Sequence, residues 1–328
     1  MELIDHLIKA SEDENPNVRR SVAMALGELG ISSAKVPLAK LLKDKEPLVK
    51  EAAIYALGKL NVVEAADLLT KLLGDDADPR KAVLRGVSLK GDEDDKPAAT
   101  AAGALGGGQK KEAQIPWRVR KAAAMMLCKL KPEIAVHPLV QMLSMDNDQA
   151  RIAALAGLGN MEADSAGPAI MELLKVESWE VRKAAAQALG KMSFTPAVPA
   201  LVGLMADSRF AVRVEAAIAL NHIKAEETIT PMMKALKEDD TPEVRRTIAI
   251  ALGNFKSEEP VPALAEAARK DEAWQVRKAA VQSLGNIRSA ACVPPVMEAL
   301  ADAHDEVRAA AGAVYPRLAA LLGGRAAD

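Results

Sequence analysis

Apolar residues recur along the chain with the spacing of helices that bury one face. In the stretch from Val181 to Leu189, the apolar residues Val181, Ala185 and Leu189 stand four positions apart. Residues at this spacing lie on one side of an α-helix and form a buried stripe. Basic and amide residues occupy the positions on the opposite side. The pattern predicts an amphipathic helix with a charged, solvent-exposed face.

This helix pattern repeats through the whole chain. Stretches 17–27, 181–190 and 276–285 are close copies, each with a basic residue that is followed eight positions later by glycine. We call this basic residue the anchor; it occurs ten times, at Arg19, Lys50, Arg80, Arg120, Arg151, Arg182, Arg213, Arg245, Arg277 and Arg308. Neighbouring anchors lie 30–32 residues apart, except for an interval of 40 between Arg80 and Arg120. A fixed period of this length predicts a solenoid of stacked units.

Each unit contains a shorter apolar stretch before the anchor helix. In Val36 to Leu42 and in Val198 to Met205, proline follows the first residue, and the first turn of a helix accommodates proline. An acidic loop then leads into the anchor helix. The sequence therefore predicts an all-α fold, a right-handed α-α superhelical solenoid of about ten helix pairs that forms one domain over residues 1–328.

The repeated motif is an acidic residue, then Pro-x-Val-Arg-x-x-Ala, then Ala-Leu-Gly. It resembles HEAT-like repeats of the phycobilin-lyase type, and the resemblance covers essentially the whole chain. Tetratricopeptide units need several aromatic residues each, whereas only 2% of this chain is aromatic, and the Thr-Pro-Leu-His of ankyrin units is absent. The motif is specific to the repeat and leaves the function open.

A column of aspartates stands six positions before the anchors. In HEAT repeats such Asp–Arg pairs form a ladder between neighbouring units, and the alternative is a stripe of arginines that binds phosphate. An arginine whose guanidinium is committed to carboxylates is not free to bind a ligand, which favours the ladder. The predicted ladder residues are Asp13, Arg19, Asp207, Arg213, Asp239, Arg245, Asp271, Arg277, Asp302 and Arg308.

Aromatic residues share one position in the repeat, three before the anchor. They are Trp117, Trp179, Phe210 and Trp274, where other units carry proline. An aromatic row that stacks on a ligand is one interpretation. Because proline substitutes freely, a cap that packs the loop onto the start of the anchor helix is the better one.

Composition limits the compartment and the classes of partner. With 43 basic and 45 acidic residues the net charge is −2, so bulk charge gives no reason to expect nucleic-acid or membrane-surface binding. No stretch approaches the ~18 uncharged residues of a membrane span, and acids interrupt the apolar N-terminus, unlike in a secretory signal. Cys128 and Cys292 lie outside any Cys-x-x-Cys pattern, which argues against a disulfide framework and a zinc site. We expect a cytoplasmic protein.

The chain lacks the patterns of related enzymes. A HEAT-like diiron hydroxylase such as deoxyhypusine hydroxylase depends on His-Glu dipeptides, whereas the residues after the four histidines here are Leu7, Pro138, Ile223 and Asp305. The glycine-rich stretch 103–111 loosely resembles a phosphate loop, but Gln109 stands where the lysine belongs. We predict no catalytic residue, no metal site and no cofactor.

The long interval between anchors contains an insertion. Residues 91–115 combine an acidic run with alanine and glycine, which bury too little apolar area to offset the entropy of ordering. We predict a flexible insertion at about 91–115 that interrupts the solenoid.

Exposed positions of the anchor helices carry more bases than acids. These positions are anchor plus one, plus five and plus nine, and the resemblance places them on the concave surface of the solenoid. The candidate partner-binding residues are Lys81, Arg85, Lys121, Lys129, Lys183, Gln187, Lys191, Arg246, Lys278 and Gln282. We predict a non-catalytic protein–protein interaction scaffold whose moderately basic concave face binds an acidic protein segment.

Three other interpretations stay open. Lysine is a good exposed helix former, so the basic face can be purely structural. HEAT-like DNA glycosylases bind nucleic acid, although a net charge of −2 weighs against this class here. The phycobilin-lyase resemblance also implies a bilin lyase or bilin chaperone role, but no residue specifically supports a tetrapyrrole site.

Overall fold

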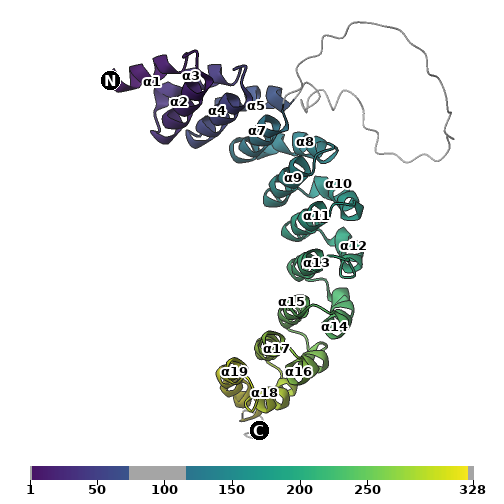
Figure 1. Ribbon diagram of the computed structural model, residues 1–328. Coiled ribbons are helices and arrows are strands. Elements are labelled where there is room, and N and C mark those ends of the chain that lie inside the picture. The colour runs from purple at the N-terminus through teal and green to yellow at the C-terminus, as the bar shows by residue number, and fades with distance from the viewer. Residues whose placement is uncertain (1, 74–115, 324–328) are drawn as a thin grey trace, which may run out of the picture. The chain divides into compact units, whose positions relative to one another are not determined.

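The computed structural model describes residues 2–73 and 116–323 of the 328-residue chain (Figure 1). Within these ranges every regular element is an α-helix or a short 3-10 turn. The helices stack in pairs, which confirms the predicted all-α solenoid for this part of the chain. The chain divides into two compact units, residues 1–145 and 146–328, and each is described by itself.

Unit 1 contains three helix pairs, in which α1 packs on α2, α3 on α4 and α5 on α7, followed by α8 packed on α7. We call the anchor-bearing member of each pair the second helix. Here the second helices are α2, α4 and α7, and they stack in that order. The bounds are α1 (Glu2–Ala10), α2 (Pro16–Glu28), α3 (Lys35–Leu41), α4 (Pro47–Lys59), α5 (Ala66–Leu73), α7 (Trp117–Leu130) and α8 (Pro132–Leu143).

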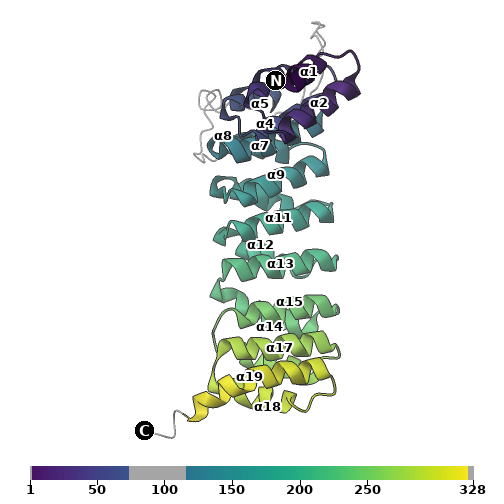
Figure 2. The same cartoon turned by 90° about the vertical axis from the view of Figure 1, so that its left-hand side faces the viewer.

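Unit 2 begins with α9 and continues with five helix pairs. Its second helices α9, α11, α13, α15, α17 and α19 form one row, as Figure 2 shows. The bounds are α9 (Asp148–Asn160), α10 (Gly167–Glu172), α11 (Trp179–Lys191), α12 (Val198–Leu204), α13 (Phe210–Ile223), α14 (Ile229–Glu238), α15 (Pro242–Gly253), α16 (Val261–Lys270), α17 (Trp274–Ile287), α18 (Val293–Ala299) and α19 (Asp305–Gly323).

The unit that the sequence pattern anchors at Arg80 falls among residues 74–115, outside the described residues. In the described part α7 stacks directly on α4 and also packs on α5. The segment 74–115 therefore connects the two helices of one repeat unit. The predicted insertion at about 91–115 lies inside this segment and likewise outside the described residues.

Local sequence fixes where the second helices begin and end. Asn15 and Asn147 cap α2 and α9 by accepting main-chain N–H groups, and α2, α4 and α15 begin with proline. The second helices that carry glycine at anchor plus eight continue past it, except α15, which ends at Gly253. The residue in the left-handed region, with φ between 50° and 67°, lies at anchor plus eleven, at Gly30, Asn61, Glu162, Ser193, Lys224, Lys256 and Arg288.

The glycine at anchor plus eight permits close stacking of the second helices. A Cβ atom added to Gly190 would lie 2.6 Å from the Cα atom of Ala219 in the next second helix. Gly27, Gly58, Gly159 and Gly253 face the same position, anchor plus six, of the helix stacked on theirs. The predicted apolar stripe is the core on the inner side of these helices, where Val181, Ala185 and Leu189 are fully buried.

Candidate functional site

The anchor arginines hold neighbouring units together. Arg245 Nε donates to Asp271 Oδ2 at 2.7 Å and its Nη2 donates to Asp271 Oδ1 at 2.9 Å. Its Nη1 also donates to the main-chain carbonyl of Asp239, at 2.9 Å. The same bidentate contact to the following unit joins Arg19 to Asp44, Arg182 to Asp207, Arg213 to Asp239 and Arg277 to Asp302.

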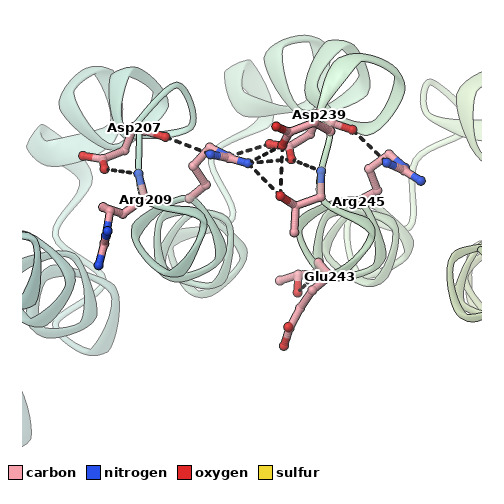
Figure 3. Close-up of polar contacts among 9 residues, drawn as sticks. Asp207, Arg209, Asp239, Glu243 and Arg245 are labelled. Atoms are coloured by element: carbon pink, nitrogen blue, oxygen red, sulfur yellow. Dashed lines mark hydrogen bonds and ion pairs between the residues drawn. The ribbon is translucent and has the colours of Figure 1, made fainter.

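Four ladder aspartates, Asp207, Asp239, Asp271 and Asp302, each bind two arginines. The carboxylate of Asp239 accepts from Arg213 of the preceding unit, and its carbonyl accepts from Arg245 of its own unit (Figure 3). The sequence pairs each aspartate with the anchor six positions later. In the structure that anchor donates to the main-chain carbonyl of the aspartate, whereas the aspartate carboxylate accepts hydrogen bonds from the anchor of the preceding unit. Arg308 follows the rule, since its Nη1 donates to the carbonyl of Asp302 at 2.7 Å.

The electrostatics of the ladder keep its arginines from binding a ligand. Burial by itself would raise the pKa of Asp207, but hydrogen bonds from Arg182 and from the N–H of Arg209 outweigh it and lower the pKa. The pKa of Asp302 is lowered first by its hydrogen bond from Arg277. The hydrogen bond to Asp271 raises the pKa of Arg245. These arginines are saturated by carboxylates and carbonyls, so they are structural.

Within the described residues the ladder is interrupted after Arg120 and after Arg151. Met145 and Val176 stand where the next carboxylate would be needed by Arg120 and Arg151. Arg120 Nε is buried and has no hydrogen-bond partner among the described residues. Arg151 instead pairs with Asp148 of its own helix at 3.3 Å.

The predicted basic residues lie on the exposed side of the second helices, which we call the second-helix face. In unit 1, α7 carries two of them, Lys121 and Lys129. In unit 2, α11 carries Lys183, Gln187 and Lys191, α15 carries Arg246, and α17 carries Lys278 and Gln282. The two remaining candidates, Lys81 and Arg85, lie outside the described residues.

Several of these cations already have partners. Lys191 Nζ donates to Asn160 Oδ1 at 2.8 Å, and Lys129 Nζ donates to the carbonyl of Gly58 at 2.9 Å. Lys278 Nζ lies 2.6 Å from a carboxylate oxygen of Glu306, and Lys121 Nζ lies 5.9 Å from the ring of Trp117. Such contacts reduce the charge available to a partner.

Two of the predicted basic residues, Lys183 and Arg246, form no ion pair with any residue in the described part of the chain. Arg246 is exposed and Lys183 is half-buried. No described carboxylate neutralises their charge by direct contact, and the same is true of Lys191, whose hydrogen-bond partner is an amide.

A buried carboxylate that the sequence reasoning missed lies in the same face. Glu215 of α13 is 7% exposed and occupies anchor plus two, where most units carry alanine. Burial raises its pKa, against the opposing charges of Lys183, His222 and Lys191. The signal available in the sequence was the acid at an alanine position. Glu215 weakens the positive potential around α11 and α13.

The basic residues converge best between α15 and α17. A pocket of about 350 Å³ there is lined by Arg246, Ile250, Trp274, Gln275, Lys278 and Gln282. Three of these are predicted site residues, and no acidic side chain lines the pocket. Ile250 is 42% exposed and supplies an apolar wall. The pocket combines two cations with aliphatic and aromatic surface.

Two of the aromatic residues before the anchors contact the following unit. Trp274 stacks on His304, with ring centroids 4.1 Å apart and planes within 9°. Trp179 lies under the guanidinium of Arg209, 5.1 Å from its centre. Trp117 instead lies near Arg118 and Lys121 of its own helix, and Phe210 is exposed. Trp274 in addition lines the pocket of α15 and α17.

The described residues contain no group of three or more His, Cys, Asp or Glu side chains arranged to hold a metal ion. None of their helices has both the length and the apolar character needed to cross a membrane.

Comparison with known proteins agrees with the repeat architecture. A family model described as HEAT repeats matches residues 4–88, 111–190, 136–221, 167–245 and 229–315. The solved structure of YibA from Escherichia coli is 17% identical with a TM-score of 0.55, covering 91% of this chain and 96% of YibA. Kap95p, solved with RanGDP, is 14% identical with a TM-score of 0.62, covering 97% of this chain and 45% of Kap95p.

The CpcE–CpcF complex of phycocyanin lyase from Nostoc sp. PCC7120 is 19% identical with a TM-score of 0.42, covering 87% of this chain and 94% of that one. The comparison with curated proteins found no match. At these identities the likenesses to solved structures show a shared fold alone.

Proposed function

Because the chain belongs to the HEAT-repeat family, we propose that it is a non-catalytic scaffold that binds an acidic segment of another protein. The observation that carries this proposal is the pocket between α15 and α17. Arg246 enters it without an ion-pair partner among the described residues, and Lys278 lines the same pocket. A planar guanidinium binds carboxylates through two parallel hydrogen bonds, which makes Arg246 the principal binding residue.

The pocket also selects for apolar neighbours of the acidic residue. Ile250 and Trp274 offer aliphatic and aromatic surface beside the two cations. A segment with glutamate or aspartate next to leucine-like residues would place a carboxylate on Arg246 and an apolar side chain on Ile250. Lys183, Gln187 and Lys191 of α11 would extend the binding surface, with Glu215 limiting their contribution.

In the proposed function the chain binds the partner segment and catalyses no reaction on it. Lys278 exchanges its pairing with Glu306, an exposed contact, for a carboxylate of the partner. Such an exchange costs little, because exposed ion pairs are worth about 0–1 kcal/mol. Kap95p, which has the same fold, binds the protein RanGDP, which supports a protein as the class of partner.

The test uses a short fluorescein-labelled peptide rich in glutamate and leucine, measured by fluorescence anisotropy. Combining Arg246→Glu with Lys278→Glu should weaken binding about 5- to 30-fold, which corresponds to about 1–2 kcal/mol. The control combines Lys234→Glu with Lys237→Glu, which reverses two exposed charges on α14, away from the pocket. Binding should also weaken at high salt.

The proposal fails if the double variant binds the peptide as well as the unchanged chain does, or if the α14 control loses as much affinity. It also fails if the peptide with glutamine in place of glutamate binds equally well. A single-stranded oligonucleotide that competes at equal concentration would instead favour nucleic-acid binding. Unchanged helical circular dichroism of each variant ensures that binding is what is compared.

A further inference from the structure

A row of large apolar side chains is exposed on the second helices of unit 1. Met24, Tyr55 and Met125 occupy anchor plus five of α2, α4 and α7, and are 53%, 43% and 42% exposed. Leu48, at the start of α4, adds a fourth side chain at 45%. We call these four residues the apolar row. In unit 2 four of the six second helices carry small or polar residues at the same position, Ala156, Gln187, Gln282 and Ala313, whereas α13 and α15 carry Ile218 and Ile250.

The apolar row borders a real depression. A pocket of about 380 Å³ lies between α2 and α4, with Met24, Leu48 and Tyr55 among its walls. Its floor is formed by small residues, because Gly27 of α2 lies directly against Ala56 of α4. Large walls over a floor of small residues suit the insertion of an apolar side chain.

Some charged side chains around this pocket form ion pairs and others do not. Glu28 and Lys59 pair with each other across it. Arg20 and Arg118 line the pocket and form no ion pair with any residue that the structure describes. Burial, and then the nearby carboxylate of Glu51, raise the pKa of Tyr55, so its phenol stays protonated and can donate a hydrogen bond. The free charge at the rim is therefore mainly positive.

We propose that the apolar row binds an amphipathic helix of a partner protein, with carboxylates along one edge of that helix. Packed helices lie about 8–10 Å apart, so successive side chains of the apolar row on α2, α4 and α7 are separated by about that distance. Seven residues of an α-helix advance about 10.5 Å and return to nearly the same face. Apolar residues at i and i+7 would thus reach successive side chains of the row. Three residues of a strand cover a similar distance but end on the opposite face.

The side chains of the apolar row suit the binding of an amphipathic helix. Methionine is flexible and polarizable, so Met24 and Met125 can adapt to the side chains of a bound helix. Tyr55, in the middle of the row, offers a rigid ring and a donor, the features of a binding hot spot. Arg20 and Arg118 would bind the acidic edge of the helix. The proposal concerns a different surface and partner from the pocket of α15 and α17, and does not depend on it.

The test compares two peptides of equal composition. In the first, leucines at i, i+3 and i+7 share one helical face and glutamates follow along its edge; in the second, the same residues are distributed around the helix. Binding to the full chain is followed by the ¹³C-methyl signals of methionine. The first peptide should shift the signals of Met24 and Met125, and Tyr55→Ser should weaken it about tenfold. Met24→Gln is the second variant.

Two controls separate this surface from the basic pocket. Arg246→Glu combined with Lys278→Glu should leave the shifts that the first peptide causes in the Met24 and Met125 signals unchanged. Arg20→Glu combined with Arg118→Glu should weaken binding of the first peptide several-fold, in a salt-dependent manner. If the first peptide binds here while the acidic peptide ignores the pocket of α15 and α17, only the proposed function fails.

The proposal is overturned if both peptides bind equally, or if the shifts persist in both Tyr55→Ser and Met24→Gln. Sedimentation that shows a dimer dissolved by Tyr55→Ser would make a second copy the occupant and overturn it as well. Tyr55-dependent binding to phosphatidylglycerol vesicles would assign the row to a lipid surface, with the same consequence. Tyr55 is an exposed residue, so its variant is expected to fold, and circular dichroism verifies this.

Discussion

Asp239 and Asp240 allow the effect of burial on the ladder to be measured, because both carboxylates contact the guanidinium of Arg213. Asp239 accepts from Nε at 2.8 Å and from Nη2 at 3.0 Å, and its side chain is 5% exposed. Asp240 lies closer, 2.7 Å from Nη2, but is 87% exposed. Charge, length and arginine are matched, and the two residues differ in burial and geometry.

Asp239→Ala leaves the guanidinium of Arg213, itself 12% exposed, without its buried partner. The N–H of Thr241 loses its acceptor as well. Breaking a buried pair costs about 3–5 kcal/mol, and the remaining contacts of Arg213 to Asp240 and Thr241 reduce this to about 2–4 kcal/mol. Asp240→Ala removes an exposed, solvent-screened contact and should change stability little.

Hydrogen exchange of the amides of α13 and α15 is the appropriate assay, because a repeat array need not unfold in one step. Asp239→Ala should accelerate exchange about 30- to 900-fold, the factor that corresponds to 2–4 kcal/mol. Asp240→Ala should leave it nearly unchanged. Equal effects of the two variants would refute the argument that burial, and not contact distance, determines the strength of a rung.

Three further predictions concern packing and titration. Gly190→Ala should lower the free energy of unfolding in urea by about 1–3 kcal/mol, because the added methyl group would overlap Ala219. Gly203→Ala, which has open space around it, should instead stabilise α12 by about 0.5 kcal/mol. Equal effects of the two variants would contradict the packing argument. Burial raises the pKa of Glu215, so its ionised carboxylate destabilises the folded state at pH 7, and Glu215→Gln should raise the unfolding midpoint there. This gain should vanish as the pH falls to about 4, where the glutamate is protonated in both states. A gain that persists at about pH 4 would have another cause. The pKa values of Asp44, Asp207 and Asp302 are lowered in the folded state, so the free energy of unfolding should decrease as the pH falls below about 4. A free energy of unfolding that does not change over this acid range would contradict the prediction.

The sequence was sufficient to predict the repeated helix and its buried face. The stripe of Val181, Ala185 and Leu189 follows from a spacing of four residues, and their complete burial confirms it. The partner of each ladder carboxylate did not follow in the same way. Most units carry an aspartate and an arginine at the same two positions. From the sequence, an arginine can therefore pair with the aspartate six residues before it or with that of the next unit, which for Arg245 and Asp271 lies 26 residues away.

Contacts between units also explain what was missed in the candidate site. Counting exposed positions on single helices gave Lys278 as a candidate binding residue, but Glu306 of the next second helix pairs with it. Glu215 was overlooked because it occupies a position where most units carry alanine, and its burial depends on the neighbouring helix. The unit assigned to Arg80 lies outside the described residues and stays a prediction.

The most direct test of the central claim is photo-crosslinking from the centre of the basic pocket. Gln282, which lines the pocket of α15 and α17 and is exposed, is replaced by p-benzoylphenylalanine, and the same replacement at Lys237 on α14 serves as the control. The account predicts that the glutamate- and leucine-rich peptide crosslinks at position 282 and not at 237, and that high salt suppresses the product. Crosslinking at 237 alone, or equally at both positions, would contradict the assignment of acidic-segment binding to this face.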